Sequence, residues 1–139
     1  MIQFSNQEIR YTLKNKLKVR EWVKSIFTGE QKKMGDLSYI FCSDDYLHAL
    51  NVQYLKHDTL TDIITFDYNE AEKVCGDIFI SLERVKENAA KYSRSMDEEL
   101  GRVMAHGALH LLGYKDKSPA DKNKMREKEN QYLVSYPNL

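Results

Sequence analysis

Residues 62–80 read DIITFDYNEAEKVCGDIFI, and this stretch contains two runs typical of β-strands. The runs 62–66 and 75–80 are rich in β-branched and aromatic residues, which favour strands. The polar stretch 67–73 between them predicts a hairpin loop. Helical patterns lie on both sides of this pair, so the chain is predicted to combine a small sheet with helices.

The segments before this pair predict both strand and helix. In order they are a short strand at 1–5, an amphipathic helix over 16–27 and a strand over 37–42. Gly29 fits the end of the first helix. Ser43 is placed to cap a second helix that runs towards Tyr54.

Three further helices are predicted downstream, and each begins at a serine. Ser81 and Ser118 are positioned as N-caps, and Ser95 together with Glu98 fits a capping box. Gly113 is predicted to end the second of these helices in the left-handed conformation. This order of elements predicts an α/β or α+β fold, in which a small mixed sheet of about four strands packs with helices.

Length and composition narrow the class of protein. A chain of 139 residues, 42% hydrophobic and 30% charged, suits one folded domain over residues 1–139 and argues against disorder. The net charge is zero, so composition alone favours no nucleic-acid partner. No apolar run approaches the ~18 residues that span a bilayer, and the first eight residues lack a signal-peptide pattern. We therefore expect a cytoplasmic protein without membrane contact, in which Cys42 and Cys75 are buried, reduced thiols.

The segment with the most chemical information is HGALHLLGYKD at 106–116. His106 and His110 are four positions apart on a predicted helix, which places both imidazoles on one face, close enough to share a metal ion. Gly113 allows the chain to turn back, so that Asp116 can supply a third ligand. Two nitrogens and one carboxylate leave a coordination position for water, and zinc lowers the pKa of bound water to about 7. We predict one zinc ion per chain, held by the pattern HxxxHxxGxxD.

Two other interpretations of this motif compete with a catalytic metal site. The two histidines could be satisfied core residues on an apolar helix face, but a ligand-type residue that follows a glycine at fixed spacing favours metal. The spacing is also similar to that of metzincin proteases, in which a Glu after the first His is the general base. Gly107 occupies that position here and cannot transfer a proton, so peptide hydrolysis by that scheme is disfavoured.

The same motif resembles that of the YbeY family, bacterial metal-dependent endoribonucleases that mature ribosomal RNA. The family pattern is His-Gly-x-Leu-His-Leu-x-Gly-Tyr-Asp-His, and the chain matches it at His106, Gly107, Leu109, His110, Leu111, Gly113 and Tyr114. Further matches in the same order are Leu50-Asn51, Tyr54, Asp58, the run 61–66, Gly76-Asp77-Ile78 and Met125. The resemblance therefore extends over residues 50–125.

Three features depart from the family pattern. Asp116 stands where the family has His, and Lys115 where it has Asp. Aspartate is a competent zinc ligand, but its charge makes bound water less acidic and favours harder ions. Leu55 replaces an Arg that the resemblance places on the RNA phosphate, and Lys56 is our candidate substitute on the substrate side. Leu60 replaces a Pro, which affects only loop stiffness.

The resemblance implies a single-strand-specific endoribonuclease in ribosomal RNA maturation and ribosome quality control. Its partners would be ribosomal RNA and the ribosome or small-subunit assembly components. The metal would polarise a phosphoryl oxygen, activate water, or do both. An RNA 2′-hydroxyl as the nucleophile stays equally open. A ribosome-assembly binding protein with a structural metal and little catalysis is the second hypothesis, favoured by the missing Arg and the zero net charge.

The sequence identifies no catalytic side chain. Asp62 is a substrate-side candidate as a wall of the site, although a turn residue that caps local backbone fits the same position. Glu98 and Glu99 are interpreted as charges at a helix N-terminus rather than as catalytic acids. The basic stretch 115–128 alternates with acids, which is typical of a solvated helix face, yet beside a metal site it could guide a phosphate backbone.

Overall fold

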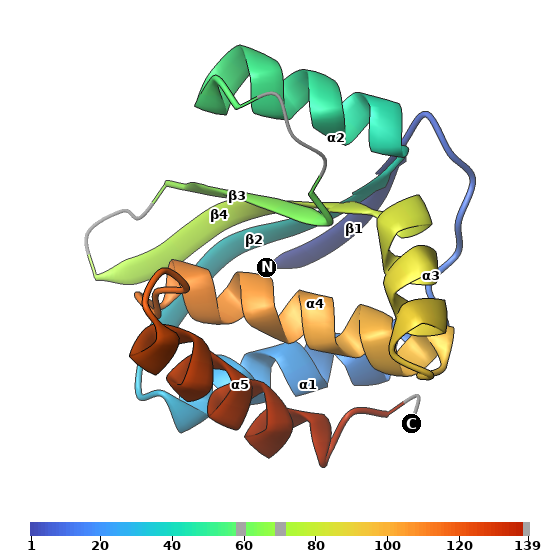
Figure 1. Cartoon of the computed structure of the whole chain (residues 1–139). Coiled ribbons are helices and arrows are strands. Elements are labelled where there is room, and N and C mark those ends of the chain that lie inside the picture. The colour runs from blue at the N-terminus through green and yellow to red at the C-terminus, as the bar shows by residue number, and fades with distance from the viewer. Residues whose placement is uncertain (58–60, 69–71, 138–139) are drawn as a thin grey trace.

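The structure is a computed structural model that describes residues 1–57, 61–68 and 72–137 (Figure 1). Asp58 and Leu60 of the sequence comparison lie outside the described residues. The elements are β1 (Ile2–Gln7), α1 (Lys16–Gly29), β2 (Lys33–Cys42), α2 (Asp44–Leu50), the π-helical turn η1 (Asn51–Leu55), β3 (Ile63–Asp67), β4 (Lys73–Ser81), α3 (Leu82–Lys91), α4 (Met96–Leu111) and α5 (Pro119–Leu133).

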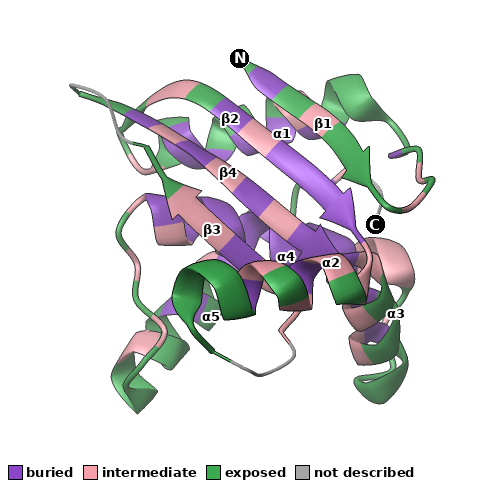
Figure 2. Cartoon of the chain, turned by 90° about the horizontal axis from the view of Figure 1, so that it is seen from above, coloured by how far each residue is buried: buried purple, intermediate pink, exposed green. Residues whose placement is uncertain are grey.

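The four strands form one mixed sheet in the order β1-β2-β4-β3 (Figure 2). The strands β1, β2 and β4 run parallel, and β3 lies antiparallel to β4 at one edge. The pair β3 and β4 is the hairpin predicted from residues 62–80, with Ile63 opposite Ile80. The predicted mixed α/β architecture with about four strands is therefore confirmed.

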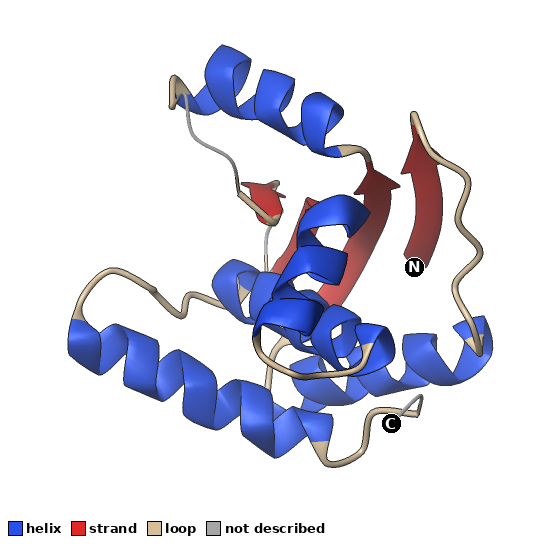
Figure 3. Ribbon diagram, turned by 45° about the vertical axis from the view of Figure 1, so that its right-hand side comes forward, coloured by secondary structure: helices blue, strands red, loops and turns tan. Residues whose placement is uncertain are grey.

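Helices cover the two faces of the sheet unequally. The helices α1, α4 and α5 lie on one side and α2 on the other (Figures 1 and 3). Helix α4 packs against β3, β4, α1, α3 and α5. Because so many elements surround it, α4 is apolar around most of its circumference, and ten of its residues are buried. The two histidines of α4 are not among these ten, and both are partly exposed.

The predicted serine caps are confirmed. Ser43, Ser81, Ser95 and Ser118 each accept a hydrogen bond from a backbone N–H three residues ahead, at 3.0–3.2 Å. At Ser95 the structure shows the serine half of the predicted capping box. The complete reciprocal box is at Ser118, whose N–H also donates to the Asp121 carboxylate. These caps set the starting residues of α2, α3, α4 and α5.

The helix predicted from Ser43 towards Tyr54 is present, and at the buried Asn51 it changes from α-helix to the π-helical turn η1. One expectation needs correction. Cys42 is buried as predicted, but Cys75 is partly exposed; neither is in a disulfide. None of the helices in the described part of the chain combines the length and apolar character that a bilayer-spanning segment requires.

Candidate metal centre and its cavity

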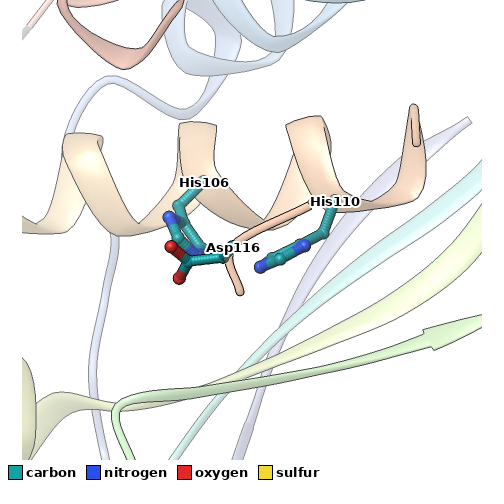
Figure 4. A group of neighbouring side chains, drawn as sticks. All are labelled: His106, His110 and Asp116. Carbon is teal, nitrogen blue, oxygen red and sulfur yellow. The ribbon is translucent and has the colours of Figure 1, made fainter. Parts of the chain in front are cut away.

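The three predicted ligands lie together at the C-terminal half of α4 (Figure 4). His106 and His110 project from the helix, and Asp116 comes from the segment that follows it. One ligand atom from each lies within 4.8 Å of the others, and His106 Nε2 is 3.5 Å from Asp116 Oδ2. Gly113 has a φ of +104° and turns the chain back, as predicted, so that Asp116 reaches the histidines. This group of side chains could hold a metal ion.

Each imidazole has a hydrogen-bond partner at Nδ1. His106 Nδ1 is 2.6 Å from Glu129 Oε2, and His110 Nδ1 is 3.0 Å from the backbone oxygen of Tyr114. Both partners are acceptors, so in the neutral form of each ring the proton lies on Nδ1 and the lone pair on Nε2 is available for an ion. A carboxylate that orients a histidine in this way is common around protein-bound metals. Glu129 was not found from the sequence, because it lies 23 positions after His106 with no motif to mark it.

The charges around His106 form a buried network. Arg102 donates to Glu129 at 2.9 Å. Burial would raise the pKa of Glu129, but the hydrogen bond to His106 and the Arg102 charge hold it below its usual range. Burial would lower the pKa of His106, but Glu129 and Asp116 raise it. Burial and the His106 charge lower the pKa of His110, which favours the neutral ring that binds metals.

A cavity of about 400 Å³ lies beside the candidate ligands, and His106 and Asp116 form part of its wall. Asp62, immediately before β3, lines the same cavity. Its side chain accepts a hydrogen bond from Asn88 Nδ2 at 3.5 Å, and its backbone oxygen accepts one from the Ser81 N–H. Burial raises the pKa of Asp62, although the His106 charge opposes the shift. The geometry therefore favours Asp62 as a wall of the site over a simple turn residue.

Glu99 does more than supply charge to the N-terminus of α4. Its side chain is only 6% exposed, lies at the cavity and accepts a hydrogen bond from Arg94 at 2.9 Å. Burial raises the pKa of Glu99 against the effect of Arg94. The sequence-based interpretation was therefore incomplete for Glu99, because helix position alone cannot show which side of α4 becomes enclosed.

The basic side chains at the cavity are Arg94, Arg102, Lys122 and Arg126. Arg94 and Arg102 are paired with acids, as described above. Lys122 and Arg126, four positions apart on α5, form no ion pair within residues 1–57, 61–68 and 72–137. The part of the basic stretch 115–128 that carries them therefore borders the cavity rather than a solvated face alone.

Lys56 lies at the end of η1, away from this lining. Its side chain is exposed, and its backbone has the left-handed φ of +55°. It is not among the residues that line the 400 Å³ cavity. The structure thus places Asp62 with the candidate ligands but does not bring Lys56 to them, and a role for Lys56 in binding substrate stays a prediction.

Gly107 faces the sheet, not the cavity. A Cβ atom added here would lie 2.8 Å from Ile78 Cγ2 and 2.9 Å from Ile63 Cδ1. These distances are shorter than van der Waals contact, so α4 and the sheet approach this closely only because residue 107 is a glycine. A glutamate at this position would have to displace Ile63 or Ile78, which disfavours the protease scheme on steric grounds as well.

Comparisons with known proteins point to one family. The sequence model of the family described as "Endoribonuclease YbeY" matches residues 1–137. The chain is 49% identical to an endoribonuclease YbeY of Flavobacterium johnsoniae, over 98% of this chain and 97% of the relative. It is 50% identical to that of Flavobacterium psychrophilum, over 96% and 94%. A solution structure of a Thermotoga maritima protein shares the fold, with a TM-score of 0.67 and 27% identity over 98% of this chain and 89% of that one.

Proposed function

The chain belongs to the YbeY family of endoribonucleases, and we propose that His106, His110 and Asp116 bind the one zinc ion on which its activity depends. The observation that carries the proposal is the pair of acceptors, Glu129 and the Tyr114 carbonyl, that occupy Nδ1 of both imidazoles. Such partners fix the tautomer in which Nε2 is free for an ion. The donor set of two nitrogens and one carboxylate is typical of catalytic zinc sites.

A divalent ion at these ligands supplies Lewis-acid chemistry, which neutralises charge on a phosphate and makes water more acidic. The side chains around it have separate tasks in our proposal. Asp62 accepts the proton of the nucleophile, whether that is water or the RNA 2′-hydroxyl. Lys122 and Arg126 hold the phosphate backbone next to the scissile bond. Glu129 keeps His106 oriented and does not contact substrate.

The charge balance of the cavity supports RNA as the substrate. Its acidic residues Asp62, Glu99, Asp116 and Glu129 equal its basic residues in number, so the lining without an ion has no formal net charge. A bound divalent ion therefore makes the site net positive. This excess of two positive charges favours a polyanion such as RNA. We further propose that the RNA is single-stranded ribosomal RNA in the cytoplasm and that ribosome or small-subunit assembly components are the partners, as the family resemblance implies.

Removing the metal tests this function directly. Zinc-loaded protein should cleave a single-stranded RNA oligonucleotide, lose this activity when a chelator strips the ion, and regain it when zinc is returned. The products and the zinc content per chain are measured in the same samples. Cleavage that persists after complete metal removal would refute the metal-dependent mechanism. RNA binding without cleavage at full zinc occupancy would instead support a binding protein with a structural metal, and an unstructured protein substrate should stay intact.

The two unpaired cations of α5 should contribute to RNA affinity. We expect Lys122→Ala/Arg126→Ala to bind single-stranded RNA about tenfold more weakly at low salt and to keep its zinc. The logarithm of the binding constant falls linearly with the logarithm of the salt concentration, and each phosphate contact on a single strand contributes about 0.7 to the steepness of this line. Loss of two contacts should therefore reduce the steepness by about 1.4. Affinity is measured by titration of labelled RNA over a range of salt concentrations.

Lys124→Ala is the matched control for this measurement. Lys124 lies on the same helix, is exposed, and pairs loosely with Glu127 outside the cavity. Its removal should change the affinity and the slope much less. Equal effects of Lys124→Ala and of the double variant would mean that α5 acts only through its general charge.

A further inference from the structure

A partly buried carboxylate outside the 400 Å³ cavity accepts hydrogen bonds from two segments next to the candidate metal centre. Glu30, the residue after α1, has a side chain only 10% exposed. It accepts hydrogen bonds from the hydroxyls of Tyr114 and Tyr132, and from Lys128 Nζ at 3.2 Å. Burial would raise the pKa of Glu30, but these donors lower it, which keeps the side chain ionised.

Both segments that Glu30 contacts also carry the outer partners of the histidines. Tyr114 reaches Glu30 with its hydroxyl, while its backbone oxygen accepts the hydrogen bond of His110 Nδ1. Lys128 reaches Glu30 and is the chain neighbour of Glu129, the acceptor for His106 Nδ1. One carboxylate is thus joined to each imidazole through a short path of hydrogen bonds and backbone.

The position of the third candidate ligand, Asp116, also depends on the contact between Glu30 and Tyr114. Asp116 is two residues after Tyr114, in the segment between α4 and α5, and its side chain is 37% exposed. The segment turns at Gly113, the residue type with the greatest backbone freedom. A fixed Tyr114 restricts this segment before any ion binds, which lowers the entropy lost when Asp116 becomes a ligand.

We propose that Glu30 is a positioning residue of the metal centre, which holds the Tyr114 turn and α5 so that both imidazoles and Asp116 are preorganised for the ion. This inference rests on the proposed zinc site. Glu30 does not touch the ion or the substrate. Its effect is transmitted through the Tyr114 carbonyl and through Glu129.

Zinc affinity of Glu30→Gln and Tyr114→Phe tests the proposal. Glu30→Gln keeps the shape of the side chain but removes its charge. Tyr114→Phe removes the hydroxyl but keeps the backbone carbonyl that contacts His110. We expect each to raise the zinc dissociation constant about tenfold. This is the lower end of the loss of affinity found when residues that hydrogen-bond to metal ligands are replaced. Because both variants weaken the same contact between Glu30 and Tyr114, their effects on the dissociation constant should combine to less than the product of the two single effects. Affinity is measured by competition with a chelating indicator.

Cobalt substitution separates positioning from simple loss of stability. The visible absorption of bound Co²⁺ reports the geometry of its ligands, and it should shift in Glu30→Gln and Tyr114→Phe but not in the control Glu21→Gln, an exposed residue of α1. Unfolding of the metal-free proteins is measured alongside. Lower stability with an unchanged dissociation constant and unchanged spectrum would overturn the proposal. A wild-type chain that binds no zinc would instead overturn the metal site on which it rests.

Discussion

His106→Ala should lose its zinc ion and cleave RNA about a thousandfold more slowly than the wild-type chain. His106 is the candidate ligand with the most support around it, since Glu129 contacts its Nδ1 and Asp116 lies 3.5 Å from its Nε2. A metal ion stabilises the charge of a transition state by several kcal/mol, and a loss of about 4 kcal/mol corresponds to about a thousandfold in rate. Zinc per chain by elemental analysis and single-turnover RNA cleavage are the two measurements.

Two further variants separate metal loss from damage to the fold. His110→Ala should give the same loss with less effect on stability, because its outer partner is a backbone carbonyl rather than a buried carboxylate. His57→Ala, at an exposed position outside the site, should behave as the wild type. If His106→Ala kept one zinc per chain and cleaved RNA at the wild-type rate, the zinc ion would be bound elsewhere.

Asp62→Asn should lower kcat by about a hundredfold or more, which is typical for removal of a general acid or base. The wild-type rate should fall as the pH decreases, because protonated Asp62 cannot accept a proton. Burial raises the pKa of Asp62, so this loss should begin at a higher pH than the ordinary aspartate value of about 3.9. The rate of Asp62→Asn should not show this decrease at low pH. Zinc content is checked at each pH, because protons also compete for the histidines.

Stability measurements separate this role from a structural one. A carboxyl whose pKa is raised in the folded state destabilises the fold wherever it is ionised, above its unfolded pKa. Metal-free Asp62→Asn should therefore be at least as stable as the wild type at neutral pH, and the difference should vanish as the pH falls below about 4. A folded Asp62→Asn variant with near-normal kcat would exclude the proton-transfer role.

Local signals account for most of what could be predicted about the fold. The serine caps, the hairpin of residues 62–80 and the left-handed Gly113 depend on neighbours within a few positions, and all three are confirmed. Local signals did not predict two features of the fold. One is the change to a π-helical turn at the buried Asn51, within a helix that runs towards Tyr54 as expected. The other is Cys75, which was predicted to be buried and is partly exposed.

The residues of the candidate site also fall into those that the sequence could predict and those that it could not. His106, His110 and Asp116 could be named from spacing, since one helix and one glycine turn bring them together. The residues that support them could not be named, because the chain brings them from afar. Glu129 is 23 positions from His106, and Glu30 is 84 positions from Tyr114. Lys56, chosen because it neighbours a family position, lies outside the cavity lining, which shows how little sequence proximity says about side-chain position.

The sequence by itself determined the mixed α/β class, the helix starts and the three metal-ligand candidates, because caps, periodicity and i,i+4 spacing act within single elements. Only the tertiary structure decided which nitrogen of each imidazole is free, which acids are buried beside arginines, and which cations border the cavity. Those properties depend on burial and on hydrogen bonds between α1, α4 and α5, whose side chains meet only after the helices pack against the sheet.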